Sequence, residues 1–236
     1  MDPQPRALGL ETPLMHGPDV AEVQRMLGIE ADGWFGPATA RAVAGWKRAR
    51  GDSAPSPDLT FVQRRRLLAD VLLRAVQLTE RWAADGLREE PPGSNRVPEL
   101  IALAERLEVA PAYSPMGFPW CAFAVFLAAL AAGGETAVLG LQRRAFNPLY
   151  APTVLAEAQA GRSGLRIVAA GQAWRGDLVL FDWDLAGGDP ADHVARLVQA
   201  PLNGRVRTVD GNSGDDGLVA LREREIGSVR AFARDS

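Results

Sequence analysis

The sequence changes its character near residue 165, and this change limits the folds open to the chain. Before it, apolar residues recur at helical spacing, as in the broad stripe within residues 59–84. After it come short runs with β-branched residues, separated by clusters of Gly, Asn and Asp: GDLVLFDW, HVARLVQA, RVRTVDGN and LVALRERE. Helices followed by strands, rather than alternating with them, predict an α+β domain whose strands form an antiparallel sheet.

Two helix starts define a small all-α unit at the N-terminus. Gly17-Pro18-Asp19 and Gly36-Pro37 each place a proline where the first turn of a helix accepts it. Residues 51–58, GDSAPSPD, have the composition of a linker. We therefore predict a helical module at residues 1–50, a linker at 51–58 and the α+β domain at 59–236.

Composition excludes several classes of function. With a net charge of −3, the 236-residue chain has no broad basic field for nucleic acid. The apolar run that follows Cys121 is shorter than the ~20 residues of a membrane helix. The first residues lack the basic and apolar segments of a secretory signal, so we expect none. We expect a monomer that binds neither nucleic acid nor a membrane.

The only cysteine of the chain stands at a predicted helix start, in PWCAFAVFLAALAAGG (residues 119–134). Pro119 favours a helix that begins at about Trp120 or Cys121, which places the sulfur in the first turn. The unpaired N–H groups at that end favour a thiolate over a thiol. The simpler interpretation is a buried cysteine that packs as a small apolar side chain.

A thiolate nucleophile also needs an imidazole, and His193 is the only histidine in the same predicted domain. A four-residue loop at 201–204 would place His193 directly opposite Asn212 on the next strand, with Asp210 in diagonal reach on the same face. A two-residue turn at Asn203-Gly204 would instead oppose His193 with Gly214. In the first register, a carboxylate and an amide flank the imidazole, as a catalytic base requires.

Metal chemistry is not expected. One cysteine and one histidine in the same domain are too few for a usual zinc site. The segment before Cys121 lacks the closely alternating oxygen ligands of a calcium loop. We therefore predict no metal and no other cofactor.

The C-terminal part, about residues 66–236, resembles the CHAP family of cysteine, histidine-dependent amidohydrolases and peptidases. Five landmarks carry the resemblance: EPPGSN (90–95), PWCA (119–122), GDLV (176–179), HV (193–194) and DGN (210–212). It implies a papain-like fold, with Cys121 as nucleophile, His193 as general base and then acid, and Asp210 with Asn212 as orienting groups. Many relatives have Glu at the position of Asp210, so which of the two orients His193 stays open.

The N-terminal unit looks like the small helical peptidoglycan-binding domain found beside cell-wall hydrolases. The matching residues include Asp32-Gly33, Phe35-Gly36-Pro37 and Trp46. Together the two resemblances imply bacterial peptidoglycan as the partner, in a protein similar to phage endolysins. Such an enzyme would be made in the host cytoplasm and act on the wall after release, as an N-acetylmuramoyl-L-alanine amidase or a peptidoglycan endopeptidase.

Two other functions fit the same residues: a non-catalytic wall-binding or phage structural protein, and a cysteine acyl transferase. Four further residues are candidates for substrate contact. Ser94 and Asn95 could line the site or simply form a turn, and Trp120 and Trp183 could flank the substrate or belong to the core. We expect loops within residues 140–165 to determine which bond is cut.

Overall fold

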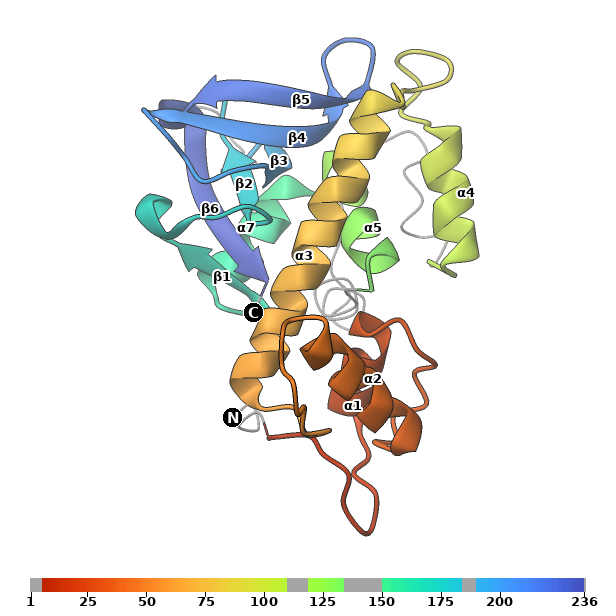
Figure 1. Ribbon diagram of the computed structural model, residues 1–236. Coiled ribbons are helices and arrows are strands. Elements are labelled where there is room, and N and C mark those ends of the chain that lie inside the picture. Colours follow the sequence, from red (N-terminus) through yellow and green to blue (C-terminus); the bar gives the residue numbers. More distant parts are fainter. Residues whose placement is uncertain (1–5, 110–118, 134–149, 184–189, 236) are drawn as a thin grey trace. The chain divides into compact units, whose positions relative to one another are not determined.

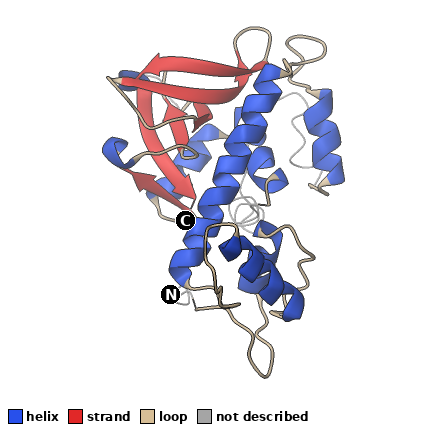
Figure 2. Cartoon of the chain, viewed as in Figure 1, coloured by secondary structure: helices blue, strands red, loops and turns tan. Residues whose placement is uncertain are grey.

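The computed structural model describes residues 6–109, 119–133, 150–183 and 190–235 (Figure 1). It has six α-helices and a six-stranded antiparallel sheet in these ranges, so the predicted α+β class is confirmed (Figure 2). The helices are α1 (Pro18–Met26), α2 (Pro37–Arg48), α3 (Phe61–Ala84), α4 (Pro98–Arg106), α5 (Cys121–Ala131) and α7 (Ala151–Gln159). The strands are β1 (Leu165–Val168), β2 (Leu178–Phe181), β3 (His193–Leu197), β4 (Arg205–Ser213), β5 (Leu218–Glu225) and β6 (Val229–Asp235). No helix in the described ranges has both the length and the apolar character needed to cross a bilayer.

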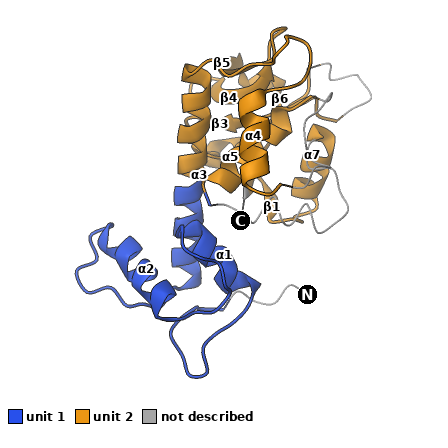
Figure 3. Cartoon of the chain, turned by 90° about the vertical axis from the view of Figure 1, so that its right-hand side faces the viewer, with its two compact units in different colours: residues 1–71, 133–135 blue, residues 72–132, 136–236 orange. Residues whose placement is uncertain are grey.

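The chain divides into two compact units, coloured separately in Figure 3. Unit 1 comprises residues 1–71 and 133–135, and unit 2 comprises residues 72–132 and 136–236. The division lies within α3 and not at residues 51–58, where the sequence suggested a linker. That segment is tied into unit 1, because Lys47 Nζ donates to the carbonyl of Asp58 at 2.5 Å and Leu59 exchanges backbone hydrogen bonds with Leu8.

Unit 1 contains the two short helices predicted from their prolines, and both begin at the proline itself. A buried glutamine fixes the turn between them. Gln24 Nε2 donates to Asp32 Oδ1 at 2.7 Å and to the Trp34 carbonyl at 3.0 Å, while Gln24 Oε1 accepts from the Gly33 amide. This network leaves Trp34 half exposed, with its ring 4.2 Å from that of His16.

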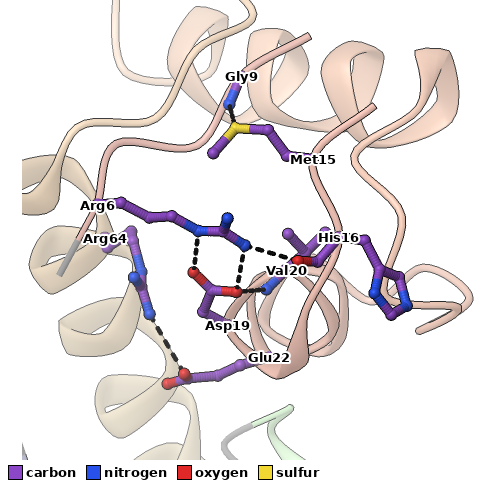
Figure 4. Close-up of polar contacts among 8 residues, drawn as sticks. All are labelled: Arg6, Gly9, Met15, His16, Asp19, Val20, Glu22 and Arg64. Carbon is purple, nitrogen blue, oxygen red and sulfur yellow. Dashed lines mark hydrogen bonds and ion pairs between the residues drawn. The ribbon is translucent and has the colours of Figure 1, made fainter. Parts of the chain in front are cut away.

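Charged groups hold the N-terminal segment against α1, as Figure 4 shows. Arg6 binds both carboxylate oxygens of Asp19, at 2.8 and 3.0 Å, and also donates to the carbonyl of His16. Hydrogen bonding to Arg6 lowers the pKa of Asp19 below its usual value. Arg64 of α3 reaches Glu22 at 3.3 Å, so the first turns of α3 also contact α1. Further along α3, Asp70 accepts a hydrogen bond from Trp46 Nε1 at 2.9 Å, which is consistent with unit 1 extending to residue 71.

The sheet of unit 2 has the strand order β1-β6-β2-β3-β4-β5, with every neighbouring pair antiparallel. Helices α5 and α7 pack against one face, through a core that includes Val125, Leu155, Leu178 and Val194 (Figure 1). The opposite face carries a second buried cluster, with Val179, Phe181, Ala195, Leu197, Val206 and Phe232. Since side chains alternate along a strand, His193 and Phe181 lie on this second face.

Helix α5 is apolar on all sides because it is packed on all sides. Its residues from Cys121 to Ala129 are buried. One side contacts the sheet, and the other packs against α3 and α4 through Val76, Leu100 and Phe123. A helix that is hydrophobic all round is expected in such a position, inside a layered core.

The connection between β3 and β4 has the turn of one predicted register and the strand pairing of the other. Leu202 and Arg205 exchange backbone hydrogen bonds around a two-residue turn at Asn203-Gly204, both in left-handed conformation. The four-residue loop was therefore wrong. However, Arg196 pairs with Val209 and Leu197 with Thr208, which is the register that the four-residue loop would have produced. Two extra residues near Pro201 on the β3 side restore it.

Two elements were not predicted from the sequence. Helix α7 occupies residues within the 140–165 stretch that was expected to form loops, and its apolar side packs on β1 and β6. Residues 140–149 lie outside the described ranges. Strand β1 adds a short edge beside β6, with Leu165 opposite Asp235. Within 140–165, residues 151–159 and 165 therefore belong to a helix and a strand and not to the loops that were expected to determine which bond is cut.

Candidate active site

Helix α5 presents Cys121 in its first turn, as predicted. Trp120 is the N-cap residue, and its carbonyl accepts the first helical hydrogen bond from the Ala124 amide at 3.0 Å. Cys121 as a whole is 4% exposed. The backbone amides of Ala122 and Val194 both hydrogen-bond to the sulfur. Cys121 therefore lies where two backbone donors favour a negative charge.

The sulfur of Cys121 contacts β3 at a point where β3 and β4 are no longer paired. The β3–β4 ladder contains the pairs Arg196–Val209 and Leu197–Thr208, and no pair continues it toward His193 in the part of the chain that the structure describes. In an unbroken ladder the amide of Val194 would bond to β4. Here it bonds to the sulfur of Cys121 instead. The split between β3 and β4 thus lets a residue from the helix layer reach the imidazole on the other face.

His193 lies between Cys121 and Asp210. Its Nε2 is 3.0 Å from Asp210 Oδ2, and its side chain also hydrogen-bonds with Cys121. Because Nε2 is taken by the carboxylate, Nδ1 is the nitrogen left for the sulfur. His193 and Asp210 are both buried. The three side chains form a continuous chain of contacts from thiol to imidazole to carboxylate.

Two residues that the sequence reasoning missed complete the surroundings of Asp210. Thr208 Oγ1 donates to Asp210 Oδ1 at 2.6 Å, and Arg224 Nη2 lies 2.6 Å from Oδ2. Arg224 Nη1 also donates to Thr208 Oγ1 at 3.0 Å. The β4–β5 register, in which Val206 faces Arg224, puts Arg224 on the same face as Asp210. A prediction of the β4–β5 register from the sequence could therefore have identified Arg224 as a neighbour of Asp210.

The electrostatics favour a charged pair. Burial raises the pKa of the Cys121 thiol, but its contacts with His193 and the backbone amides outweigh burial, so the net pKa is below the ordinary value. Burial lowers the pKa of His193, but hydrogen bonds to Asp210 and Cys121 outweigh burial and raise the pKa to about 9. Burial raises the pKa of Asp210, while His193, Arg224 and Thr208 bring it below its usual value. At neutral pH these directions favour thiolate, imidazolium and carboxylate together.

Asn212 does not share this geometry. The ladder stops before it could oppose His193, and Asn212 adopts a left-handed backbone with φ 54° beside the irregular β4–β5 pairing. In the described residues it has no hydrogen bond to His193. Of the two orienting candidates, Asp210 is the one in contact with the imidazole.

The tryptophans take different places. Trp120 is fully buried, and its indole N–H donates to Glu89 Oε1 at 2.9 Å. This corrects the expectation that it flanks the substrate, because its ring has no exposed surface. Trp183 is 49% exposed, stacks on Phe181 at 4.8 Å and lies 6.1 Å from the His193 ring. It can therefore offer an aromatic surface beside the imidazole.

Ser94 and Asn95 form a turn. Ser94 Oγ accepts from the Arg96 amide at 3.2 Å, and Asn95 has a left-handed backbone with φ 53°. The structure gives neither residue a contact with Cys121 or His193 in the described ranges.

Among the described residues there is no group of three or more His, Cys, Asp or Glu side chains that could hold a metal ion.

Gly211 lets Trp120 pack beneath Asp210. A Cβ at this position would lie 2.6 Å from Ala124 Cβ and 2.8 Å from the Trp120 ring. We expect Gly211→Ala to lower the free energy of unfolding by about 1–3 kcal/mol through overpacking and to slow any reaction at His193. Gly227→Ala is the matched control, since a Cβ there meets nothing within 4 Å. Equal thermal stability of the two variants would contradict this expectation.

Comparison with protein-family models, with curated proteins and with solved structures gives no match to this chain.

Proposed function

We propose that the chain is a cysteine hydrolase of peptidoglycan, with a CHAP-type, papain-like catalytic unit. The observation that carries the proposal is the contact of the Cys121 thiol with His193, whose Nε2 is held by Asp210. A nucleophile, a base and an orienting carboxylate in this order are the requirements for acyl transfer through a thioester.

The reaction follows from the protonation states. The Cys121 thiolate attacks the carbonyl carbon of an amide, and a C–S bond forms. His193 gives its Nδ1 proton to the departing amine as the C–N bond breaks. Water then attacks the thioester, His193 accepts a proton from it, and the C–S bond breaks to release a carboxylic acid and restore the thiolate. The amide N–H of Cys121, at the helix start, is a donor available to the developing oxyanion.

Peptidoglycan is proposed as substrate from the resemblance of both units to wall-directed modules. Features of unit 1 support this assignment. Trp34 is 48% exposed on a turn fixed by the buried Gln24, and the ring of His16 lies beside it. Exposed aromatic rings held in fixed positions suit the apolar faces of sugar rings. The proposed substrate bond is an amide in the peptide part of the wall, as in an amidase or an endopeptidase.

The product identifies the reaction. Purified walls are incubated with the protein in water enriched in oxygen-18, and the released fragments are analysed by mass spectrometry. Hydrolysis predicts fragments with a new amine and a new carboxylate that contains one heavy oxygen. A new amide without heavy oxygen would identify an acyl transferase, and intact walls with bound protein would identify a non-catalytic wall-binding protein. Either result would overturn the proposal. If hydrolysis is observed, the masses of the fragments identify which amide bond is cut.

A further inference from the structure

The guanidinium of Arg224 is fixed from three sides. It contacts Asp210 Oδ2 at 2.6 Å and Thr208 Oγ1 at 3.0 Å. It also lies over two aromatic rings, 4.9 Å from the centre of Phe181 and 5.3 Å from that of Trp183. Its side chain is 20% exposed. A rigid planar fork between a carboxylate, a hydroxyl and two ring faces has little freedom to leave this position.

Arg224 and His193 share one carboxylate oxygen. Nε2 of His193 is 3.0 Å from Asp210 Oδ2, and Nη2 of Arg224 is 2.6 Å from the same atom. The other oxygen is held by Thr208 at 2.6 Å. The orientation of the carboxylate, and the share of its charge that faces the imidazole, therefore depend on Arg224.

We propose that Arg224 is a positioning residue of the candidate site, which acts on His193 through the carboxylate of Asp210. This inference rests on the proposed function for its role in a reaction, but its physical content is a coupling between three side chains. Arg224 has no contact with Cys121 in the described residues, so its effect must pass through Asp210.

The direction of the coupling follows from charge. The charged groups that face the His193–Asp210 pair in the described residues are Cys121 from α5 and Arg224 from β5. Arg224 neutralises part of the Asp210 charge that the imidazolium of His193 meets. Without the guanidinium charge, Asp210 would attract the imidazolium more strongly, and the pKa of His193 would rise.

The test measures His193 directly and needs no substrate. The chain has only two histidines, so His16→Gln assigns the imidazole signals in an NMR titration of the full chain. We expect Arg224→Gln to move the His193 midpoint upward by about 0.5 pH unit or more. Arg224→Lys keeps the charge and should return the midpoint to that of the parent.

Arg222→Gln is the matched control, because Arg222 lies on the same strand and bonds to Ser213 Oγ, not to Asp210. Thermal unfolding shows whether each variant folds, and Arg224→Met replaces the glutamine variant if that one does not. A His193 midpoint that stays unchanged or falls in the folded variant overturns the inference, as does an equal shift in Arg222→Gln. Because no wall is present, these outcomes are independent of whether the chain hydrolyses peptidoglycan.

Discussion

Cys121→Ser is expected to reduce the rate at which purified walls lose turbidity by at least about 1000-fold. The substitution keeps the size of the side chain but replaces a thiolate by a hydroxyl that stays protonated at neutral pH. The loss should not come from unfolding, because serine keeps nearly the same side-chain volume at the start of α5. Turbidity loss, measured with circular dichroism of the same samples, checks both points.

The single thiol allows a second, chemical test of the same prediction. Cys121 is the only thiol for iodoacetamide to alkylate at neutral pH, so the alkylated parent should copy the serine variant, and treatment of the serine variant should change nothing. Both inactive forms should still sediment with the walls through unit 1. If the serine variant clears walls as fast as the parent, the thioester mechanism is refuted.

Asp210→Asn is expected to lower wall clearance by about 100- to 10,000-fold and to change its pH dependence. The reaction needs the imidazolium, so parent activity should decline as pH rises through the His193 pKa of about 9. Asp210 raises that pKa. Removal of its charge therefore lowers the pKa, and the alkaline decline should move to lower pH. Initial rates measured from pH 6 to about 10 check this.

Asp192→Asn provides the control for Asp210. Asp192 precedes His193 in the chain and is exposed, and its carboxylate accepts the Trp183 amide at 2.6 Å. Its loss should leave the alkaline decline where the parent has it. An Asp210→Asn variant that is folded and retains both the parent rate and the parent pH profile would exclude Asp210 from the site.

The sequence predicted several helix starts and strands, though not α7 or β1, because local chemistry determines them. Prolines mark the first residues of α1 and α2, and β-branched runs mark β3 and β4. It also predicted the diagonal contact of His193 with Asp210, which follows from side-chain alternation in one of the two registers that the sequence left open. The predicted register was correct although the predicted loop was wrong. The two extra residues near Pro201 compensate for the shorter turn, and no turn signal in the sequence indicates them.

Other parts depend on contacts that a linear pattern does not contain. The end of the β3–β4 ladder removes Asn212 from the position opposite His193. The burial of Trp120 follows from the space that Gly211 leaves, which is known only once β4 lies on α5. Arg224 comes from a fifth strand, and only its register with β4 relates it to the site.

The end of the β3–β4 ladder lets a residue on one face of the sheet contact residues on the other face. Cys121 belongs to the helical layer, whereas His193, Asp210, Trp183 and Arg224 lie on the other face of the sheet. In the proposed mechanism, we therefore expect a reactant to approach from the side of the sheet that does not carry α5. Changes in how α3 and α4 pack on α5 should therefore alter how firmly Cys121 is held. If the proposed function is correct, the surface that selects the substrate can evolve independently on the far side of the strands.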